Sequence, residues 1–384
     1  MDPSTFSETK PGRVLIIQEG AYAFIPDMLP PQLNPDWELT SALSEASAAL
    51  SELAGVACTL PNPHLLIRPF VRKEAVLSSK IEGTQASLSD VMKYEGVGDD
   101  HRSDPGDVTE VINYISALEY GLDRITTLPV GTRLITEMHE KLMIGVRGQN
   151  QAPGELRRIQ NWIGTQGVKI ENATYVPPPA SEVPNCLSDL ERYIHKKDKL
   201  PPLIRLALIH YQFEAIHPFL DGNGRIGRLL ITLLLCEWKL MPQPLLYLSA
   251  YFESNRRQYY DGLLDVSRTG NWNSWVLFFL NGISEQSRDA IQRSKRLIEL
   301  WQSYREKLQS ARVSGLLLTL VDFLFSQPIV SAARVEKALK VTPRSAQQNI
   351  DKLVKHGILV EMTGRQRNRI FCAVDVLRIV DSVD

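Results

Sequence analysis

Apolar residues recur at helical spacing along most of this chain, and this pattern predicts a mostly α-helical protein. The clearest stretch covers residues 203–216, which contain neither proline nor glycine. The same spacing predicts further helices over residues 39–56, 71–81, 107–127 and 271–307. Proline-rich residues 26–35 are expected to be extended, and the polar residues 96–106 predict a loop at a segment boundary.

The helical pattern gives way to residues that favour strands between positions 153 and 179. β-branched and aromatic residues are frequent over 168–176, and residues 171–172 supply a turn. Three consecutive prolines at 177–179 then end the pattern. We therefore expect a short β-hairpin here, with a surface hairpin of no functional role as the alternative.

The C-terminal part of the chain predicts a separate domain with a helix-turn-helix and a basic hairpin. Helices are expected over residues 313–325, 331–339 and 343–355, and strands over residues 358–362 and 369–372. Ser331 is the expected N-cap of the second helix, and Pro343 is the expected first residue of the third. This order of elements resembles a winged helix.

The predicted winged-helix-like domain is basic. Residues 331–370 contain nine Lys or Arg and three Asp or Glu, a net charge of +6. Five side chains of the third helix are able to contact base edges or phosphates: Arg344, Gln347, Gln348, Asn349 and Lys352. DNA is therefore one predicted partner, and the competing interpretation is a protein-docking or dimerisation module.

The most informative stretch runs from His217 to Arg228 and combines an imidazole, a carboxylate, small turn residues and two guanidinium groups. His217 precedes a proline, which disfavours the helical conformation and should end the helix there. Residues 222–224 are Gly-Asn-Gly, and their backbone amides can approach an anion closely where Cβ atoms are absent. The helical pattern resumes at Arg225, so the loop leads into a helix N-terminus, a natural phosphate site.

These residue types predict a site that holds a polyphosphate and deprotonates a neighbouring group. Asp221 is a hard oxygen ligand that suits Mg²⁺, an ion usually held by one or two carboxylates together with substrate phosphates. The backbone of residues 222–224 would hold the α- and β-phosphates. Arg225 and Arg228 share a helix face and would hold the outer phosphates. His217 titrates near neutral pH and is suited to act as a general base.

The same stretch resembles the signature of the Fic family, H-x-F-x-D/E-G-N-G-R-x-x-R, and matches all eight specified positions. The resemblance implies a helical Fic core with a β-hairpin flap. It also implies transfer of AMP from ATP to a Ser, Thr or Tyr hydroxyl of a protein, with release of pyrophosphate. ATP and Mg²⁺ are the implied substrate and cofactor. The alternative is an ordinary Gly/Asn turn, which would need neither the histidine nor the spaced arginines.

The resemblance assigns roles by position in the motif. It implies that His217 is the base, that Asp221 holds the metal ion, and that Phe219 anchors the loop by packing. It also implies that Asn223 and Gly224 form the anion hole and that Arg225 and Arg228 bind the β- and γ-phosphates. The full set of implied nucleotide-binding residues is Gly222, Asn223, Gly224, Arg225, Gly227 and Arg228.

Two further regions gain an interpretation from the resemblance. The expected hairpin is similar to the flap of Fic proteins, which holds the target segment in an extended form by main-chain pairing. Asn255 and Tyr259 are the implied wall of the adenine pocket. For a tyrosine on a helix, packing in the core is the alternative.

An upstream segment resembles the inhibitory motif of self-inhibited Fic proteins, S/T-x-x-x-E-G/N. Here it consists of Ser78, Glu82 and Gly83, at the end of the helix predicted over 71–81. The position of the motif implies the class with an N-terminal inhibitory helix. If Glu82 pairs with Arg228, the arginine cannot bind the γ-phosphate, and ATP is held in a geometry unsuited to attack. The alternative is a solvated glutamate with Gly83 as a helix C-cap.

Length and composition bound the domain organisation. At 384 residues, the chain is long enough for more than one domain. We predict an N-terminal segment with the inhibitory helix over 1–105, the Fic core over 106–300, and the winged-helix-like domain over 301–384. The hydrophobic fraction of 43% supports sizeable cores, and the net charge of −1 argues against polyanion binding by the chain's bulk charge.

The remaining expectations concern compartment and partners. Four cysteines without a C-x-x-C pair argue against structural zinc and a disulfide framework, and reduced thiols fit a cytoplasmic protein. The polar N-terminus lacks the apolar run of a signal peptide, and no stretch is long enough to span a membrane. The expected partners are a target protein, which can be the chain itself, and DNA; a homodimer is left open.

Three alternatives to a self-inhibited adenylyltransferase follow from the same residues. The first is a Fic-type transferase with another nucleotide donor, and the second is a Fic enzyme that removes AMP. The third is a DNA-binding regulator whose Fic core only senses ATP. The presence of His217 argues against a pure sensor, because phosphate binding alone needs no base.

Overall fold

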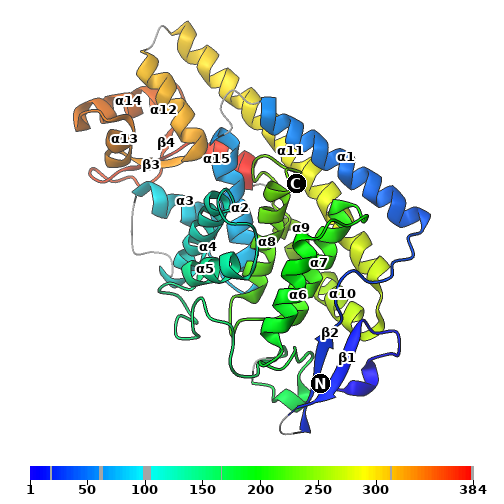
Figure 1. The fold of residues 1–384 in the computed structure, drawn as a ribbon. Coiled ribbons are helices and arrows are strands. Elements are labelled where there is room, and N and C mark those ends of the chain that lie inside the picture. The colour runs from blue at the N-terminus through cyan, green and yellow to red at the C-terminus, as the bar shows by residue number, and fades with distance from the viewer. Residues whose placement is uncertain (18–19, 60–63, 98–104, 166, 312–313, 382–384) are drawn as a thin grey trace. The chain divides into compact units, whose positions relative to one another are not determined.

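The computed structural model describes residues 1–17, 20–59, 64–97, 105–165, 167–311 and 314–381. Helices make up most of these residues, and the strands form two small antiparallel sheets (Figure 1). The expected mostly α-helical fold class is therefore confirmed. Contacts divide the chain into two compact units. The first comprises Met1–Ser51, Asn113–Leu240 and Leu248–Gln286, and the second comprises Glu52–Ile112, Met241–Tyr247 and Ser287–Asp384.

The first unit begins with a short 3₁₀ helix, η1 (Pro3–Thr5), and a β-hairpin that the sequence pattern did not predict. Strands β1 (Gly12–Ile16) and β2 (Tyr22–Pro26) pair antiparallel, with Gly12 opposite Pro26. The other elements lying wholly in this unit are α5 (Thr132–Leu142), η3 (Ile170–Asn172), α6 (Val183–His195), α7 (Pro202–Ile216), α8 (Asn223–Glu237), α9 (Ser249–Ser254) and α10 (Arg256–Thr269).

Helices α7 and α8 form the centre of the first unit and lie side by side (Figure 1). Twelve of the fifteen residues of each helix are buried, so both helices are covered on nearly every side. A fully buried leucine contributes about 1.5–3 kcal/mol. The loop between these helices is therefore held by two well-buried helices.

The second unit contains α2 (His64–Ile81), α3 (Leu88–Val97) and the C-terminal elements. These C-terminal elements are α12 (Gly315–Ser326), β3 (Ile329–Ser331), α13 (Ala332–Leu339), α14 (Pro343–Lys355), β4 (Val360–Glu361), β5 (Ile370–Cys372) and α15 (Val374–Asp381). The antiparallel sheet has the order β3-β5-β4. The side-chain amide of Gln327 donates to the carbonyl of Met92 (2.6 Å) and so joins this C-terminal part to α3.

The C-terminal elements confirm the winged-helix-like prediction and add to it. The helices and the hairpin lie where the pattern placed them, and the Ser331 hydroxyl accepts from the amide of Arg334 as an N-cap (3.3 Å). Strand β3 and helix α15 were not predicted. Three residues of β3 are too few to give a clear alternation, although their pairing with β5 completes the sheet.

Three long helices contribute residues to both units: α1 (Trp37–Thr59), α4 (Pro105–Arg124) and α11 (Trp272–Ser310). Together with α2 they confirm the helices predicted in these regions. The predicted boundary at residue 300 falls inside α11, and the proposed division into domains stays a prediction. Within the loop predicted over 96–106, residues 98–104 lie outside the described part of the chain.

The segment predicted as a hairpin differs in detail. Ile163 and Tyr175 form a single antiparallel bridge, and the 3₁₀ helix η3 (Ile170–Asn172) covers the turn that was expected at residues 171–172. The carbonyls of Ile170 and Glu171 accept from the amino group of Met1 (3.1 and 2.8 Å). The sequence pattern had no means of showing this long-range contact.

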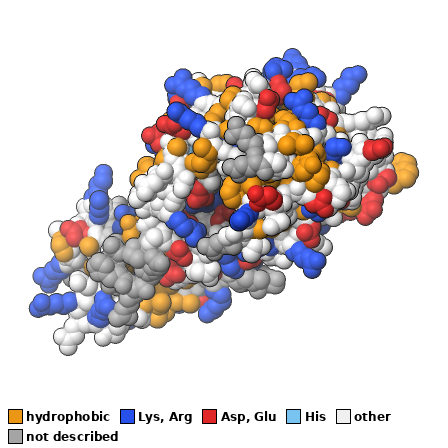
Figure 2. All heavy atoms as spheres, turned by 90° about the horizontal axis from the view of Figure 1, so that it is seen from below, with side chains coloured by type: hydrophobic (Ala, Val, Ile, Leu, Met, Phe, Trp, Pro, Cys, Tyr) orange, Lys and Arg blue, Asp and Glu red, His pale blue; other side chains and the backbone are white. Residues whose placement is uncertain are grey.

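No helix in the described ranges is both long and apolar enough to cross a membrane. On the face shown in Figure 2, basic and acidic side chains are interspersed with apolar ones, which agrees with the near-zero net charge.

Candidate functional site

The motif loop, defined here as residues 217–222, connects α7 to α8 through two left-handed residues. His217 follows the last residue of α7 with φ +49°, and its amide donates to the carbonyl of Phe213 (3.0 Å). Gly222 has φ +78° and precedes Asn223, where α8 begins. The predicted end of the first helix is confirmed, whereas α8 starts two residues before the predicted Arg225.

The side chain of Asn223 closes the motif loop. Its carbonyl oxygen accepts from the amide of Phe219, and its amide nitrogen donates to the carbonyl of the same residue, each at 2.8 Å. Asn223 is only 2% exposed. The first intrahelical bond of α8 runs from Ile226 to Gly222, so the amides of residues 223–225 lie ahead of the helical ladder. Such amides form an anion site at a helix N-terminus.

Asp221 presents a half-buried carboxylate at the start of α8. One carboxylate oxygen accepts from the amide of Gly222 (2.6 Å) and lies 3.5 Å from the Arg225 guanidinium. Gly148 lies directly against the other oxygen, since a Cβ there would be 2.5 Å from it. The described residues contain no cluster of three or more His, Cys, Asp or Glu able to hold a metal ion. The Asp221 carboxylate thus suits Mg²⁺ only when substrate phosphates complete the set of ligands.

Both motif arginines are buried at the N-terminal end of α8, Arg225 with 3% and Arg228 with 2% of the residue exposed. Gly227 lies between them and allows α8 to approach α7 closely. A Cβ at Gly227 would lie 2.2 Å from the carboxylate of Glu214. The observed role of this glycine is therefore packing, and its role in nucleotide binding stays a prediction.

Arg157 is a buried residue at the site that the sequence analysis missed. Its guanidinium donates to the backbone carbonyls of His217 (2.9 Å), Pro178 (2.5 Å) and Ile216 (3.4 Å). Its own amide donates to the carbonyl of Pro218 (2.9 Å). Burial lowers the pKa of Arg157 to about 10, which still leaves it charged at neutral pH. Arg157 therefore holds His217 in its left-handed conformation.

His139 is the second residue that the sequence analysis did not connect to the site. Its ring is fully buried and stacks on Phe219 with ring centroids 3.8 Å apart and planes within 5°. Nε2 lies 2.9 Å from the carbonyl of Asp221, and Nδ1 accepts from the amide of Gly154 (2.9 Å). Burial lowers the pKa of His139 to about 4. Its partners are 15 and 82 residues away, so no local spacing revealed them.

The two candidates for the adenine pocket lie in different surroundings. Tyr259 is 1% exposed, and its hydroxyl is 2.9 Å from Nε2 of His210. The other nitrogen of His210 is 3.2 Å from the carbonyl of Gly227, so it carries the proton and Tyr259 donates to Nε2. Burial lowers the pKa of His210 to about 3. Asn255 is half-buried between α9 and α10 and donates to the carbonyl of Tyr251 (3.0 Å).

The inhibitory motif lies in the second unit. Ser78 is fully buried in α2, which ends at Ile81, and Glu82 is exposed just beyond it. Gly83 has φ +102°, a conformation that favours glycine, and its amide donates to Lys80 (3.0 Å). The motif loop belongs to the first unit. The pairing of Glu82 with Arg228 therefore stays a prediction.

The five predicted DNA contacts on α14 differ in how exposed their side chains are. Arg344, Gln348 and Lys352 are exposed. Asn349 is 5% exposed, and its amide donates to the carbonyl of Ser345 (2.8 Å), so its side chain stabilises the helix itself. The side-chain amide of Gln347 donates to the carboxylate of Asp351 (2.7 Å).

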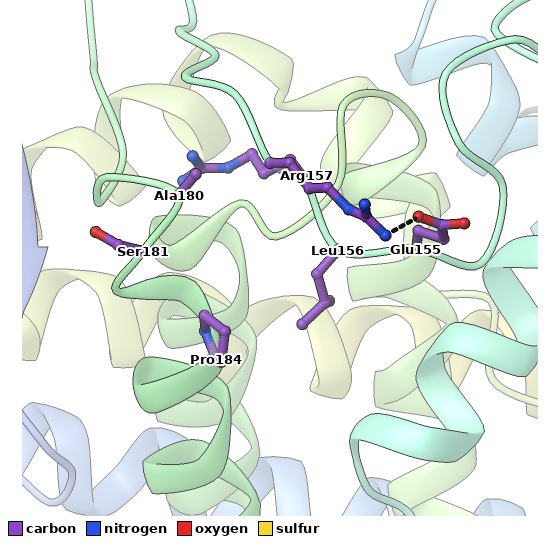
Figure 3. Close-up of a pocket in the computed structure, with 7 residues that line it drawn as sticks. Glu155, Leu156, Arg157, Ala180, Ser181 and Pro184 are labelled. Atoms are coloured by element: carbon purple, nitrogen blue, oxygen red, sulfur yellow. Dashed lines mark hydrogen bonds and ion pairs between the residues drawn. The ribbon is translucent and has the colours of Figure 1, made fainter.

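A surface pocket of about 600 Å³ lies beside Arg157, between the segment from Glu155 and the start of α6 (Figure 3). Figure 3 shows Ala180, Ser181 and Pro184 on one side of this pocket and Glu155 on the other. Glu155 pairs with the exposed guanidinium of Arg158 (2.9 Å). The pocket thus borders the residue that holds the carbonyl of His217, but it contains none of the motif side chains.

Three stretches of the chain match profiles of known protein families. Residues 40–123 match the profile described as Fic/DOC family N-terminal, and residues 129–235 match that of the Fic/DOC family. Residues 317–372 match a profile described as HTH DNA binding domain.

Curated relatives match the chain over about half of its length. A probable protein adenylyltransferase from Aquifex aeolicus is 27% identical over 174 residues, which is 44% of this chain and 48% of the relative. Protein adenylyltransferase Fic from Drosophila erecta is 28% identical over 197 residues, 51% of this chain and 35% of the relative. The chain therefore spans less than half the length of these relatives.

Solved structures show the fold. A Fic family protein from Desulfovibrio desulfuricans aligns with a TM-score of 0.58 and 20% identity, over 90% of this chain and 98% of that protein. Fic-1 (residues 134–508) from C. elegans aligns with a TM-score of 0.54 and 21% identity, over 68% of this chain and 74% of that one. At these identities, the likeness concerns the fold alone.

Proposed function

Because this chain belongs to the Fic/DOC family, we propose that it is a protein adenylyltransferase that moves AMP from ATP to a Ser, Thr or Tyr hydroxyl of a protein. The observation that carries the proposal is the motif loop. This loop contains a histidine and a carboxylate, two buried arginines follow it in α8, and Asn223 and Arg157 hold the loop closed. A turn with only a structural role would not need this set of groups.

In the proposed reaction, His217 is the general base. It accepts the proton of the target hydroxyl while that oxygen attacks the α-phosphorus of ATP. The bond between the α-phosphorus and the bridging oxygen breaks, and pyrophosphate leaves. Arg157 holds the backbone of His217 at the end of α7, so the imidazole would start from a fixed position when it accepts the proton of the target hydroxyl.

The start of α8 provides the proposed polyphosphate site. The amides of residues 223–225 would bind the α- and β-phosphates, and Arg225 and Arg228 would bind the outer ones. Asp221 would hold Mg²⁺ together with the phosphates, and the ion when bound neutralises charge that develops on the leaving pyrophosphate. Burial of both arginines makes their charges more effective, because little water screens them.

The segment around the Ile163–Tyr175 bridge is the proposed flap. It is anchored to the motif loop, since the side-chain amide of Asn161 donates to the carbonyl of Phe219 (2.8 Å). Its apolar side chains face solvent: Ile159 is 64%, Trp162 43% and Ile163 39% exposed. Such side chains suit the docking of a target segment beside the site, and a flexible segment of the chain itself would qualify as a target.

We further propose that Glu82 inhibits the enzyme by pairing with Arg228. Incubation with ATP labelled on the α-phosphate tests both proposals. We expect label on protein with Glu82→Gly, little with the unchanged chain, and none when His217→Ala is added to Glu82→Gly. Equal labelling with and without Glu82→Gly would remove the inhibitory role. Label that persists with His217→Ala would remove the catalytic role of His217.

DNA binding is a second candidate function, favoured by the match of residues 317–372 and by the exposed Arg344, Gln348 and Lys352 on α14. Phosphate contacts release counterions, so binding should weaken steeply as salt rises. A gel shift at increasing salt concentration, with Lys352→Glu beside the unchanged chain, tests this. Absence of any shift at low salt would favour the protein-docking alternative.

The rival nucleotide reactions have their own tests. ATP, GTP, CTP and UTP labelled on the α-phosphate identify the donor by which label reaches the protein. Incubation with an AMP-modified protein tests removal of AMP. A core that only senses ATP would bind the nucleotide yet leave label in solution with every variant.

A further inference from the structure

We propose that His139 is a positioning residue of the motif loop, which sets the orientation of the Asp221 carboxylate through the peptide bond that follows Asp221. This inference rests on the proposed function, since it assigns how the metal-binding carboxylate is held. His139 touches neither of the reacting groups in the proposal, so its effect must pass through the loop.

The hydrogen bonds of His139 define a single neutral tautomer. The amide of Gly154 donates to Nδ1, so Nδ1 carries no proton. The carbonyl of Asp221 can only accept, so Nε2 carries the proton and donates it at 2.9 Å. Helix α5 supplies the ring, and its deep burial leaves it without competing water. The tautomer that can hold the Asp221 carbonyl is therefore selected by Gly154.

The peptide bond between Asp221 and Gly222 carries this constraint to the carboxylate. The bond is planar and trans, so its carbonyl and amide point in opposite directions. His139 holds the carbonyl end, and the amide end donates to the Asp221 carboxylate at 2.6 Å. If the imidazole no longer held the carbonyl, the peptide could rotate and the carboxylate would lose its fixed partner.

Packing around the ring leaves this arrangement little freedom. Phe219 covers one face of the imidazole in a parallel stack. Gly222 has a left-handed backbone, and a Cβ there would lie 3.1 Å from the sulfur of Met143 and 3.4 Å from Nε2 of His139. Glycine therefore allows the peptide to approach the ring. Outer-shell partners of this kind typically change metal affinity about 10- to 100-fold when removed.

Substitutions can separate the hydrogen bonds from the packing. His139→Phe keeps an aromatic ring on Phe219 but loses both hydrogen bonds. His139→Gln offers an amide donor near the position of Nε2 and loses the stack. His195 supplies a matched control, because its Nε2 also donates to a backbone carbonyl, that of Val130 two residues before α5 (2.8 Å).

The first measurement is hydrogen exchange at the amide of Gly222, which needs no transfer activity. We expect exchange to become about tenfold faster in His139→Phe, to recover in part in His139→Gln, and to stay unchanged in His195→Phe. Unchanged exchange in His139→Phe would overturn the proposal.

The second measurement is the Mg²⁺ concentration for half-maximal AMP transfer, in the Glu82→Gly background. It should rise about 10- to 100-fold in His139→Phe, with partial recovery in His139→Gln. A lowered rate with an unchanged Mg²⁺ requirement would show a merely structural role and overturn the proposal. If the Glu82→Gly parent transfers no AMP, the proposed function fails, while the exchange at Gly222 still decides the role of His139.

Discussion

Arg157→Lys tests whether the conformation of His217 depends on a buried guanidinium. In Arg157, Nε reaches the carbonyl of His217 and Nη2 that of Pro178. Lysine keeps the charge but has one ammonium group at the end of its chain, and a methylene near the position of Nε. The bond to the His217 carbonyl is therefore lost even if the ammonium still reaches Pro178.

The expected magnitude follows from the contacts. A hydrogen bond to a charged group contributes about 1.5–3 kcal/mol. The left-handed conformation of His217 costs about 1–2 kcal/mol for a residue with a Cβ, and the Arg157 contact offsets that cost. If the lost hydrogen-bond energy appears in full as a higher activation free energy, because the general base is misplaced, kcat falls about 10- to 100-fold. The KM for ATP should change little, because the proposed phosphate contacts lie at the start of α8.

The assay is steady-state AMP transfer in the Glu82→Gly background, with thermal unfolding measured alongside. Arg158→Lys is the matched control, since this neighbouring side chain is 85% exposed and pairs with Glu155 at the surface. Exposed pairs contribute about 0–1 kcal/mol, so the control should retain kcat and stability. A full kcat in Arg157→Lys, or a raised KM for ATP with unchanged kcat, would refute the reasoning.

Three further predictions concern the framework of the site. Asn223→Asp keeps the size but removes the donor to the Phe219 carbonyl, so urea unfolding should show a loss of about 1–3 kcal/mol; no loss would mean that the closure is unimportant. Gly227→Ala places a Cβ 2.2 Å from the carboxylate of Glu214 and should cost about 1–3 kcal/mol; adding Glu214→Ala should restore part of it, and a lack of recovery would argue against the clash. His210 has its pKa lowered from 6.5 to about 3 in the folded state, so the unfolded state binds the proton more tightly. The stability from this residue is complete above pH 6.5 and is lost as the pH falls toward 3, by about 1.4 kcal/mol at pH 5.5. His139, whose pKa is lowered to about 4, loses a similar amount, so urea unfolding at pH 8 and pH 5.5 is compared in the unchanged chain and in His210→Phe. The fall in stability should be smaller by about 1.4 kcal/mol in the variant, and an equal fall in both proteins would contradict the prediction.

Local signals accounted for the parts of the fold that local chemistry determines. The His-Pro pair marked the end of α7, and the absence of proline and glycine before it marked a continuous helix. The N-cap Ser331 and the first-turn Pro343 similarly fixed two helices of the winged-helix-like part. The motif identified the residues that occupy the loop between α7 and α8.

The features that were missed depend on contacts far apart in the chain. Arg157 reaches a carbonyl 60 residues away, and His139 joins positions 15 and 82 residues away. Neither distance leaves a trace in hydrophobic periodicity. The hairpin expected over 168–176 differs for the same reason, since Tyr175 pairs with Ile163, which lies before the expected strands. Sequence thus predicted the chemical groups of the site, whereas the residues that hold them in place required the structure.

The central claim is that AMP, rather than another part of ATP, becomes attached to protein, and two labels test it directly. Glu82→Gly protein is incubated with Mg²⁺ and ATP labelled either on the α-phosphate or on the γ-phosphate, with His217→Ala added as the control. We predict that the α-label stays with the protein, that the γ-label is released as pyrophosphate, and that the control retains neither. Retention of the γ-label would indicate phosphate transfer, and absence of both labels despite ATP binding would contradict the adenylyltransferase assignment.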